Sequence, residues 1–266
     1  MQLNDYIQVL ESMKRNSDEA LWDDKADVFY ERVKKMDQNQ SKELIEFLKS
    51  KQILNKEANV LDVGCGTGRH TTGFSEYAKK VVGTDISQKM LNHAKKESEN
   101  LLNVSYVKAE WVETNLEERN WKKQFDLVFS SMCPGINNIA ALEKMIEASK
   151  QYCFISRSIK KTDSVEVYLK EKLNIDQRYD PHNDRNIVQL FFNILWLWGF
   201  NPEIAYYGSE TLIQYTIEEA MDRYSYLVEA GMDLNKFKST LQNLMKNGEI
   251  ETKVCSNLAW LYWKVQ

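Results

Sequence analysis

The chain has 266 residues, of which 43% are hydrophobic and 28% are charged. This length allows one sizeable buried core with additions, because single domains commonly reach ~250 residues. The 35 lysines and arginines oppose 39 aspartates and glutamates, which leaves a net charge of -4 and a pI near 5.6. This balance disfavours nucleic acid as a partner.

The sequence predicts neither a membrane span nor an export signal. Its longest apolar run, residues 190–200, is shorter than the ~20 residues that a spanning helix needs. The first residues lack a basic flank and an apolar stretch before a cleavage site, so a cytoplasmic location is expected. The four cysteines are widely spaced, which predicts reduced thiols and no metal site.

Residues 1–50 are predicted to form an N-terminal helical cap. Apolar side chains, among them Trp22, Phe29 and Tyr30, recur in it at helical spacing. A cap can close over a bound ligand and exclude water. Trp22 and Tyr30 are therefore candidates for a substrate pocket.

From residue 58 the pattern changes to short apolar strands that alternate with helical stretches. This order predicts an α/β fold with a doubly wound, mostly parallel sheet covered on both faces, in a domain over residues 51–266. Nearly continuous apolar runs are expected for strands buried on both faces. Such runs occupy residues 59–63, 80–84, 104–108, 125–130 and 152–156.

Two further strands, at residues 203–207 and 257–265, bring the predicted sheet to seven. Residues 208–256 between them are predicted as a helical insertion. Thr216 and Glu219 have the spacing of a capping box at the start of its first helix. Outside the insertion, helices are predicted over residues 88–99, 138–149, 164–173 and 187–198.

A glycine loop directly follows the first strand of the predicted sheet. Residues 60–68 read Val-Leu-Asp-Val-Gly-Cys-Gly-Thr-Gly. Backbone without Cβ atoms can approach a ligand closely, and doubly wound sheets bind ligands at this edge. A dinucleotide fingerprint places its third glycine one residue later, and here Asp62 stands two residues before the first glycine. A dinucleotide site is therefore the second choice.

An acid followed by Gly-x-Gly-x-Gly resembles the first motif of the class I S-adenosylmethionine-dependent methyltransferases. The resemblance extends over residues 59–156. It implies S-adenosyl-L-methionine as the cofactor, with Asp62 orienting the loop near the ammonium group. It also implies loop residues that line the aminocarboxypropyl arm with backbone atoms, namely Gly64, Cys65, Gly66 and Gly68.

The next two strands end in further candidates for the cofactor. Asp85 stands 21 residues after Gly64, where a carboxylate can accept hydrogen bonds from both ribose hydroxyls. Ile86 would then pack on the adenine. After the third strand, Glu110 is a candidate for the exocyclic amine of adenine and Trp111 for its face, with a core aromatic as the alternative for Trp111.

The fourth strand ends in Ser-Ser-Met-Cys-Pro-Gly, at the place that faces the reacting methyl group in the family. Ser130 is therefore assigned to the cofactor, and Met132 and Cys133 to the substrate pocket. The Asn/Asp-Pro-Pro-aromatic set of nucleic-acid amino-methyltransferases is absent. Cytosine C5 enzymes carry Pro-Cys here, whereas this chain has Cys133-Pro134, so a wall residue is the alternative to a nucleophilic Cys133.

His182, in a polar loop, is a candidate general base, with an exposed loop histidine as the alternative. No other catalytic residue is predicted, because methyl transfer from a sulfonium can rest on alignment alone. In the family the seventh strand is antiparallel, so the insertion before it is a candidate lid.

These features together predict a methyltransferase that acts on a small-molecule acceptor by direct in-line transfer, with the acceptor atom left open among N, O, S and C. Two alternatives stay open, an RNA or protein methyltransferase and a non-catalytic protein that binds S-adenosylmethionine. The oligomeric state is also open.

Overall fold

The computed structural model describes residues 2–13, 18–35, 39–176, 180, 183–228 and 232–265. The chain divides into two compact units. The first comprises Met1–Arg157, Asn186–Ala205 and Trp260–Gln266, and the second comprises Ser158–Arg185 and Tyr206–Ala259.

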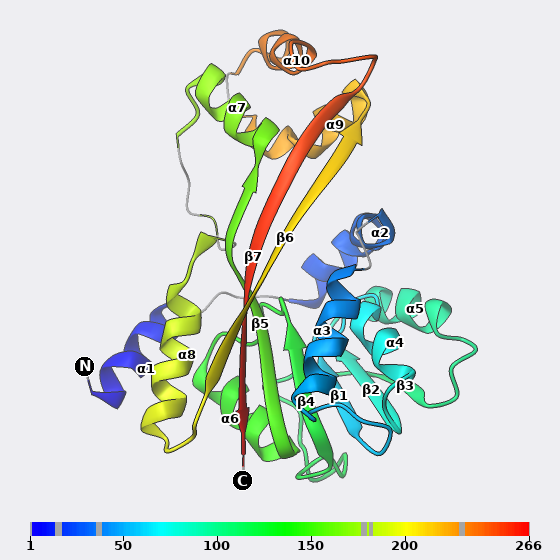
Figure 1. The fold of residues 1–266 in the computed structure, drawn as a ribbon, viewed down its shortest axis with the longest axis vertical. Coiled ribbons are helices and arrows are strands. Elements are labelled where there is room, and N and C mark those ends of the chain that lie inside the picture. Colours follow the sequence, from blue (N-terminus) through cyan, green and yellow to red (C-terminus); the bar gives the residue numbers. More distant parts are fainter. Residues whose placement is uncertain are drawn as a thin grey trace. The chain divides into compact units, whose positions relative to one another are not determined.

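The described residues contain seven strands. They are β1 (Asn59–Val63), β2 (Lys80–Asp85), β3 (Val104–Lys108), β4 (Phe125–Ser131), β5 (Ser149–Asp163), β6 (Glu203–Tyr215) and β7 (Ile250–Lys264). They form one sheet in the order β3-β2-β1-β4-β5-β7-β6 (Figure 1). The pairs among β1 to β5 are parallel, and β7 is antiparallel. The predicted α/β fold with a doubly wound, mostly parallel seven-stranded sheet is confirmed.

Helices precede and connect these strands. They are α1 (Leu3–Ser12), α2 (Glu19–Lys35), α3 (Asn39–Ser50), α4 (Arg69–Ser75), α5 (Gln88–Glu97), α6 (Ile139–Ala148), α7 (Ser164–Leu173), α8 (Asn186–Leu197), α9 (Ile217–Arg223) and α10 (Leu234–Gln242), with a short 3-10 turn at Ser225–Leu227. In the first unit α4 and α5 pack on β2 and β3, α2 packs along α5, and α6 packs on β4. Within the described residues, no helix combines the length and apolarity needed to cross a membrane.

Side-chain caps explain where two helices of the first unit begin. The Ser87 hydroxyl accepts a hydrogen bond from the Met90 amide at 3.1 Å, and the Asn138 side chain accepts one from the Ala141 amide at 2.9 Å. Each cap satisfies an amide that has no partner inside its own helix. These caps fix the starts of α5 and α6, directly after the loops that follow β2 and β4.

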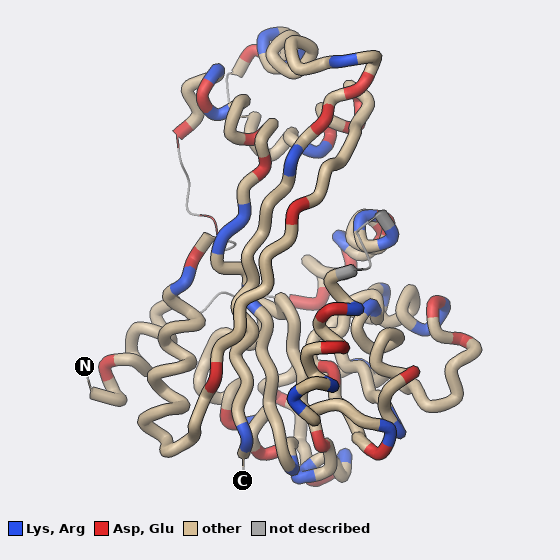
Figure 2. Tube along the Cα trace, in the orientation of Figure 1, with Lys and Arg blue, Asp and Glu red and all other residues tan. Residues whose placement is uncertain are grey.

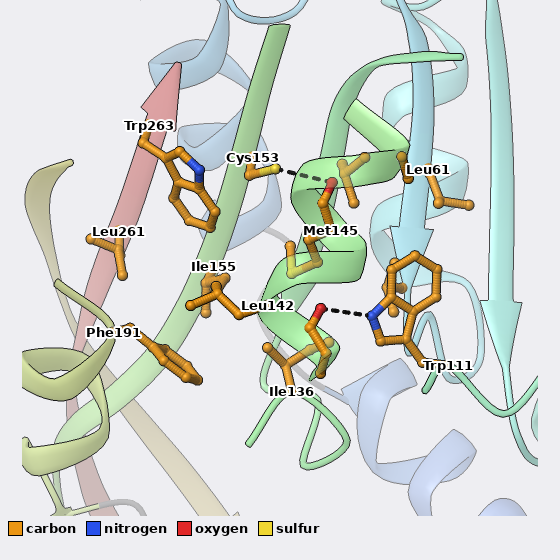
Figure 3. Close-up of a cluster of buried hydrophobic side chains, with 14 of the residues drawn as sticks. Leu61, Trp111, Ile136, Leu142, Met145, Cys153, Ile155, Phe191, Leu261 and Trp263 are labelled. Carbon is orange, nitrogen blue, oxygen red and sulfur yellow. Dashed lines mark hydrogen bonds between the residues drawn. The ribbon is translucent and has the colours of Figure 1, made fainter. Parts of the chain in front are cut away.

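One hydrophobic cluster of the first unit lies between the sheet and α6. Leu61, Val128 and Ile155, on three adjacent strands, are each 1% exposed or less. Figure 3 shows Leu142 of α6 beside Ile155. Burial of apolar side chains of this size stabilises a fold by roughly 1.5–3 kcal/mol each. This packing holds the carboxyl ends of the parallel strands in place.

Three strands are longer than the sequence predicts. β5 continues to Asp163, β6 continues to Tyr215, and β7 begins at Ile250 instead of residue 257. Along β6, exposed and half-buried residues alternate, which is typical of a strand with one face in water. The prediction relied on continuous apolar runs, the pattern of strands buried on both faces, and it missed these polar extensions.

The second unit combines the strand extensions with α7, α9 and α10. Tyr224, Phe237 and Leu241, which the insertion contributes, are fully buried in its own core together with Val165 and Ile250. The segment predicted as a helical insertion therefore contains two helices and parts of two strands. Its buried side chains pack on one another.

A buried carboxylate ties the second unit together. Asp163 is 3% exposed and accepts hydrogen bonds from the Thr252 hydroxyl at 2.6 Å and the Tyr224 hydroxyl at 2.9 Å. It also forms an ion pair of 3.2 Å with Arg223. Its other contacts are with the first amides of α7, at Val165 and Glu166. One side chain thus links α7, α9 and β7.

Candidate cofactor-binding site

The glycine loop after β1 is held against the end of β2 by backbone hydrogen bonds. The amides of Gly64 and Cys65 both donate to the carbonyl of Thr84, at 2.8 and 3.0 Å. Gly64, Gly66 and Gly68 adopt φ values of +71°, +53° and +83°. Side chains disfavour this left-handed region, so the turn requires glycine at these positions.

Close packing around the loop gives a second reason for glycine. A Cβ atom at Gly64 would lie 2.2 Å from the Cys133 sulfur, and one at Gly68 would lie 2.7 Å from the Tyr106 hydroxyl. Both distances are far inside van der Waals contact. The loop is therefore fitted between the chain after β4 on one side and β3 on the other.

Asp62, the acid before the loop, is buried at 2% exposure. Its carboxylate accepts a hydrogen bond of 2.7 Å from the Thr71 hydroxyl of α4. Burial raises the pKa of Asp62 to about 7, and the nearby charge of Asp85 adds to the rise, while the bond from Thr71 opposes it. A cationic group next to Asp62 would reverse this effect of burial.

Asp85 ends β2 and bonds directly to the loop. One carboxylate oxygen accepts from the Gly66 amide at 2.9 Å, and the other accepts from the Ser87 amide at 2.9 Å. Burial raises the pKa of Asp85, and these two amide bonds oppose the rise. Because each carboxylate oxygen has two lone pairs, Asp85 retains acceptor capacity for hydroxyl groups of a ligand.

Helix α2 packs beside this site. The Phe29 ring lies 3.5 Å from where a Cβ at Gly66 would stand. Asp23 accepts hydrogen bonds from the Ser87 hydroxyl at 2.5 Å and the Lys89 amide at 3.1 Å, both at the start of α5. The N-terminal helix is thus fastened next to Asp85 by a carboxylate placed at a helix N-terminus, where negative charge is favourable.

The two aromatic residues predicted for the substrate pocket have other contacts. Tyr30 is 8% exposed, stacks on His93 of α5 with 4.2 Å between ring centroids, and donates a hydrogen bond to Glu97. Trp22 is half-buried, with the Lys25 ammonium 5.6 Å from its ring centroid. Tyr30 therefore fastens α2 to α5. Phe29, one position earlier, is the aromatic residue that reaches the glycine loop.

The end of β4 brings its predicted residues to the loop, in different roles. Ser130 is 1% exposed, and its hydroxyl donates to the Val63 carbonyl at 2.9 Å, which joins β4 to β1. Met132 has a φ of +55°, uncommon for a side-chain-bearing residue, and its amide donates to the Ser156 carbonyl at 3.0 Å. Cys133 then places its sulfur against Gly64. Strained backbone of this kind clusters at functional sites.

The Cys133 environment opposes ionisation of the thiol. Burial raises its pKa and the charge of Asp85 adds to the rise, while Arg157 acts in the opposite direction. Because the thiolate is the nucleophilic form, these contacts favour a wall residue over a nucleophile. The pKa of Cys65 is also raised by burial and by both acids of the site.

The residues predicted for the adenine are only partly brought together. Ile86 is half-buried directly after Asp85. Glu110 is exposed, and its carboxylate accepts from the Glu113 amide at 2.6 Å, so it caps the turn after β3. Trp111 is 5% exposed in the hydrophobic core, and its indole nitrogen donates to the Ala141 carbonyl at 3.0 Å (Figure 3). This burial favours the alternative interpretation of a core aromatic.

His182, the candidate general base, lies outside the described residues. His70, on α4, is half-buried, and desolvation lowers its pKa to about 3, so it stays neutral across the physiological range. Among the described residues, no group of three or more His, Cys, Asp and Glu side chains is arranged to hold a metal ion.

Residues 60–152, which include the loop, Asp85 and Cys133, match the family described as "Methyltransferase domain". The chain carries a class I S-adenosylmethionine-dependent methyltransferase domain. The methyl donor of this family is S-adenosylmethionine. The residues of this site suit that cofactor, because the buried carboxylate of Asp62 and the half-buried carboxylate of Asp85 could take up its positive charge and its ribose hydroxyls.

Two solved structures share the fold of this methyltransferase domain. A protein of Bacillus halodurans C-125 assigned as a methyltransferase is 15% identical, with a TM-score of 0.50, over 83% of this chain and 97% of that one. The methyltransferase domain of a bacterial CtHen1-CN protein is 13% identical, with a TM-score of 0.50, over 86% and 100% of the two chains. At these identities the likeness concerns the fold alone.

A sequence relative is also found among curated proteins. An uncharacterized protein of Haemophilus influenzae is 51% identical over 43 residues, which is 16% of this chain. The match spans 17% of that relative's own length.

Sequence reasoning did not assign Asp23 or Arg157 to this region. Asp23 belongs to a helix far away in sequence, and no local pattern marks it as a cap for α5. Arg157 directly follows the apolar core of β5, and a charged residue at the carboxyl end of a buried strand was the available signal.

Proposed function

We propose that the protein transfers a methyl group from S-adenosylmethionine to a small-molecule acceptor by direct in-line displacement. The proposal rests on one observation above all, the bond between Gly66 and Asp85 beside buried Asp62. It joins the loop that would follow the aminocarboxypropyl arm to the acid that would hold the ribose. Cys65 and Gly68 complete the loop.

Each residue has a proposed task in binding. Asp62 would offset the ammonium charge, and Asp85 would accept hydrogen bonds from the ribose hydroxyls with its free lone pairs. Ile86 would pack on the adenine, and Phe29 would cover the loop. Ser130 would act through the backbone, since its hydroxyl already bonds to Val63.

When bound, S-adenosylmethionine supplies an electrophilic methyl group on a sulfonium. The protein's part is to align the acceptor, to exclude water and to keep charge away from the line of attack. Met132 and Cys133 would form the wall beside the reacting atoms. A neutral thiol in that wall suits this task, because it neither competes as a nucleophile nor brings a charge.

Two observations support a small molecule over RNA as the acceptor. Helix α2 packs along α5 and places Phe29 against the glycine loop. The Phe29 ring narrows access to the site. In each unit, Lys and Arg are interspersed with Asp and Glu along the chain (Figure 2). RNA backbones require a concentrated positive surface.

Binding of S-adenosylhomocysteine, the product of the donor, tests the cofactor first. Isothermal titration calorimetry should give a dissociation constant in the micromolar range, ~8 kcal/mol of binding free energy. The Asp85→Ala variant should bind much more weakly. Tight binding of a nicotinamide dinucleotide in place of S-adenosylhomocysteine would overturn the proposal.

Transfer of a labelled methyl group tests the acceptor. The purified protein is offered panels of amines, thiols, hydroxyl compounds, carbon nucleophiles, unstructured protein and RNA. The proposal expects label in one small-molecule class. Label confined to RNA or protein would replace it with the alternative acceptor, and cofactor binding with no transfer to any panel would support a non-catalytic role.

A further inference from the structure

Arg157 directly follows the part of β5 that pairs with β4, next to the predicted acceptor pocket. The residue before it, Ser156, accepts the hydrogen bond from the Met132 amide that joins the ends of β4 and β5. The Arg157 guanidinium donates through Nη2 to the Ile136 carbonyl, in the loop that follows β4. Arg157 therefore lies against the segment that carries both wall residues.

The positive charge of the Arg157 guanidinium is only partly compensated by hydrogen bonds and neighbouring charges. Its Nε is buried and has no hydrogen-bond partner. No carboxylate of the described chain forms an ion pair with it, and burial lowers its pKa. Buried charges in proteins are normally paired, because water no longer solvates them.

A comparison with Arg223 shows what pairing looks like in this chain. Arg223, in the second unit, is also largely buried, and its guanidinium lies 3.2 Å from the Asp163 carboxylate. Among the described residues, Arg157 has one hydrogen-bond partner, the neutral carbonyl of Ile136. An arginine that only fastened two loops together would not need a charge, since a neutral donor can satisfy a carbonyl.

From this placement we propose that Arg157 binds a carboxylate of the methyl acceptor, so that the acceptor is a small-molecule acid. The planar guanidinium presents parallel N–H groups that match a carboxylate and form two hydrogen bonds with it. The inference rests on the proposed function, since it assumes that the acceptor lies beside Met132 and Cys133. It adds the chemical class of the substrate.

A carboxylate could also come from the methionine part of the cofactor. Cys133 packs against Gly64 of the glycine loop, and it belongs to the same loop as Ile136, whose carbonyl Arg157 binds. The two sources predict different losses. If Arg157 binds the acceptor, its replacement leaves the affinity for S-adenosylhomocysteine unchanged. If Arg157 binds the cofactor, its replacement lowers the affinity for S-adenosylhomocysteine. The affinity for 5′-methylthioadenosine, which lacks the carboxylate, then stays unchanged.

The experiment uses calorimetry on the full-length protein saturated with S-adenosylhomocysteine. Benzoate is titrated as the probe, and benzamide serves as its neutral counterpart of the same shape. Wild type should prefer benzoate by ~10-fold or more. The Arg157→Gln variant should lose this preference while it binds S-adenosylhomocysteine as wild type does.

A matched control removes the same charge elsewhere. Arg185 is exposed in the second unit and has no ion-pair partner among the described residues, so Arg185→Gln should keep the benzoate preference. If Arg157→Gln does not fold, Arg157→Lys keeps the charge but loses the fork of donors and should weaken benzoate binding by a smaller factor.

Several outcomes would overturn the inference. Equal affinity of wild type for benzoate and benzamide would do so, and so would a preference that survives in Arg157→Gln. A loss of S-adenosylhomocysteine affinity in Arg157→Gln, with 5′-methylthioadenosine unaffected, would assign the arginine to the cofactor. If wild type does not bind S-adenosylhomocysteine at all, the proposed function itself fails.

Discussion

The Gly66 amide nitrogen lies 2.9 Å from a carboxylate oxygen of Asp85, so the glycine loop and the acid at the end of β2 are bonded directly to each other. The second oxygen of the same carboxylate is held by the Ser87 amide. These two amide bonds fix the orientation of the Asp85 carboxylate, so its remaining lone pairs also point in fixed directions. Preorganisation of this kind lowers the entropic cost of binding.

The first prediction concerns this carboxylate. Asp85→Ala should weaken S-adenosylhomocysteine binding by ~10- to 100-fold, because hydrogen bonds to charged groups contribute ~1.5–3 kcal/mol. Calorimetry measures the change. Asp126→Ala is the control, since Asp126 bonds to the Asn59 amide at the opposite ends of β1 and β4. Equal losses in both variants would show a general effect on the fold instead.

The second prediction concerns the contact between Gly64 and Cys133. Gly64→Ala should destabilise the protein by more than the ~1–2 kcal/mol of a left-handed alanine, because its Cβ would stand 2.2 Å from the Cys133 sulfur. Chemical denaturation gives the free energy of unfolding. Adding Cys133→Gly should recover the part due to the clash and leave the backbone part. A double variant no more stable than Gly64→Ala alone would contradict this explanation.

The third prediction follows from the raised pKa of Asp62, which is about 7 in the folded protein against an ordinary value of 3.8. Between these values the folded state binds the proton more readily than the unfolded state, so this group's contribution to stability falls as pH rises to about 7. Asp62→Asn should therefore raise the melting temperature at pH ~8 and change it little at pH ~4.

The same substitution should weaken binding of the cofactor, since the amide carries no charge for the ammonium group. Melting curves across this pH range, with and without S-adenosylhomocysteine, separate the two effects. The control is Asp24→Asn, an exposed acid on α2. A melting temperature of Asp62→Asn that follows wild type at every pH would count against the raised pKa.

The fourth prediction concerns the attachment of α2. Asp23→Asn weakens the acceptor for the Ser87 hydroxyl and the Lys89 amide, so the start of α5 should exchange its amide hydrogens faster. These bonds also lower the pKa of Asp23. The attachment should be complete at neutral pH and be lost as acid protonates this carboxylate, below the usual pKa of an aspartate. Hydrogen exchange measured by mass spectrometry tests both points, with Asp24→Asn as the neighbouring control.

The fifth prediction concerns the second unit. Asp163→Ala removes the shared partner of Thr252, Tyr224 and Arg223, which leaves a buried cation unpaired. Loss of one member of a buried pair costs about 3–5 kcal/mol of folding stability. Asp222→Ala, which removes an exposed carboxylate from α9, should change stability by less than ~0.5 kcal/mol. Denaturation of the two variants compares them directly, and similar losses would contradict a central role for Asp163.

The sequence by itself determined the parallel part of the sheet and the place of the glycine loop. Apolar runs such as residues 59–63 are buried on both faces, so periodicity and burial agree there. The loop could be placed because positive φ values favour glycine at each of its three positions. These are local properties, and a local pattern carries them.

The tertiary structure decided which side chains meet the loop. Trp111 and Tyr30 are aromatic in sequence like Phe29, but packing placed Trp111 in the core and Tyr30 against α5, and brought Phe29 to Gly66. Arg157 was placed beside Cys133 by a strand pairing that spans many residues. Such contacts depend on which surfaces bury each other, and the spacing of residues along one segment does not contain that information.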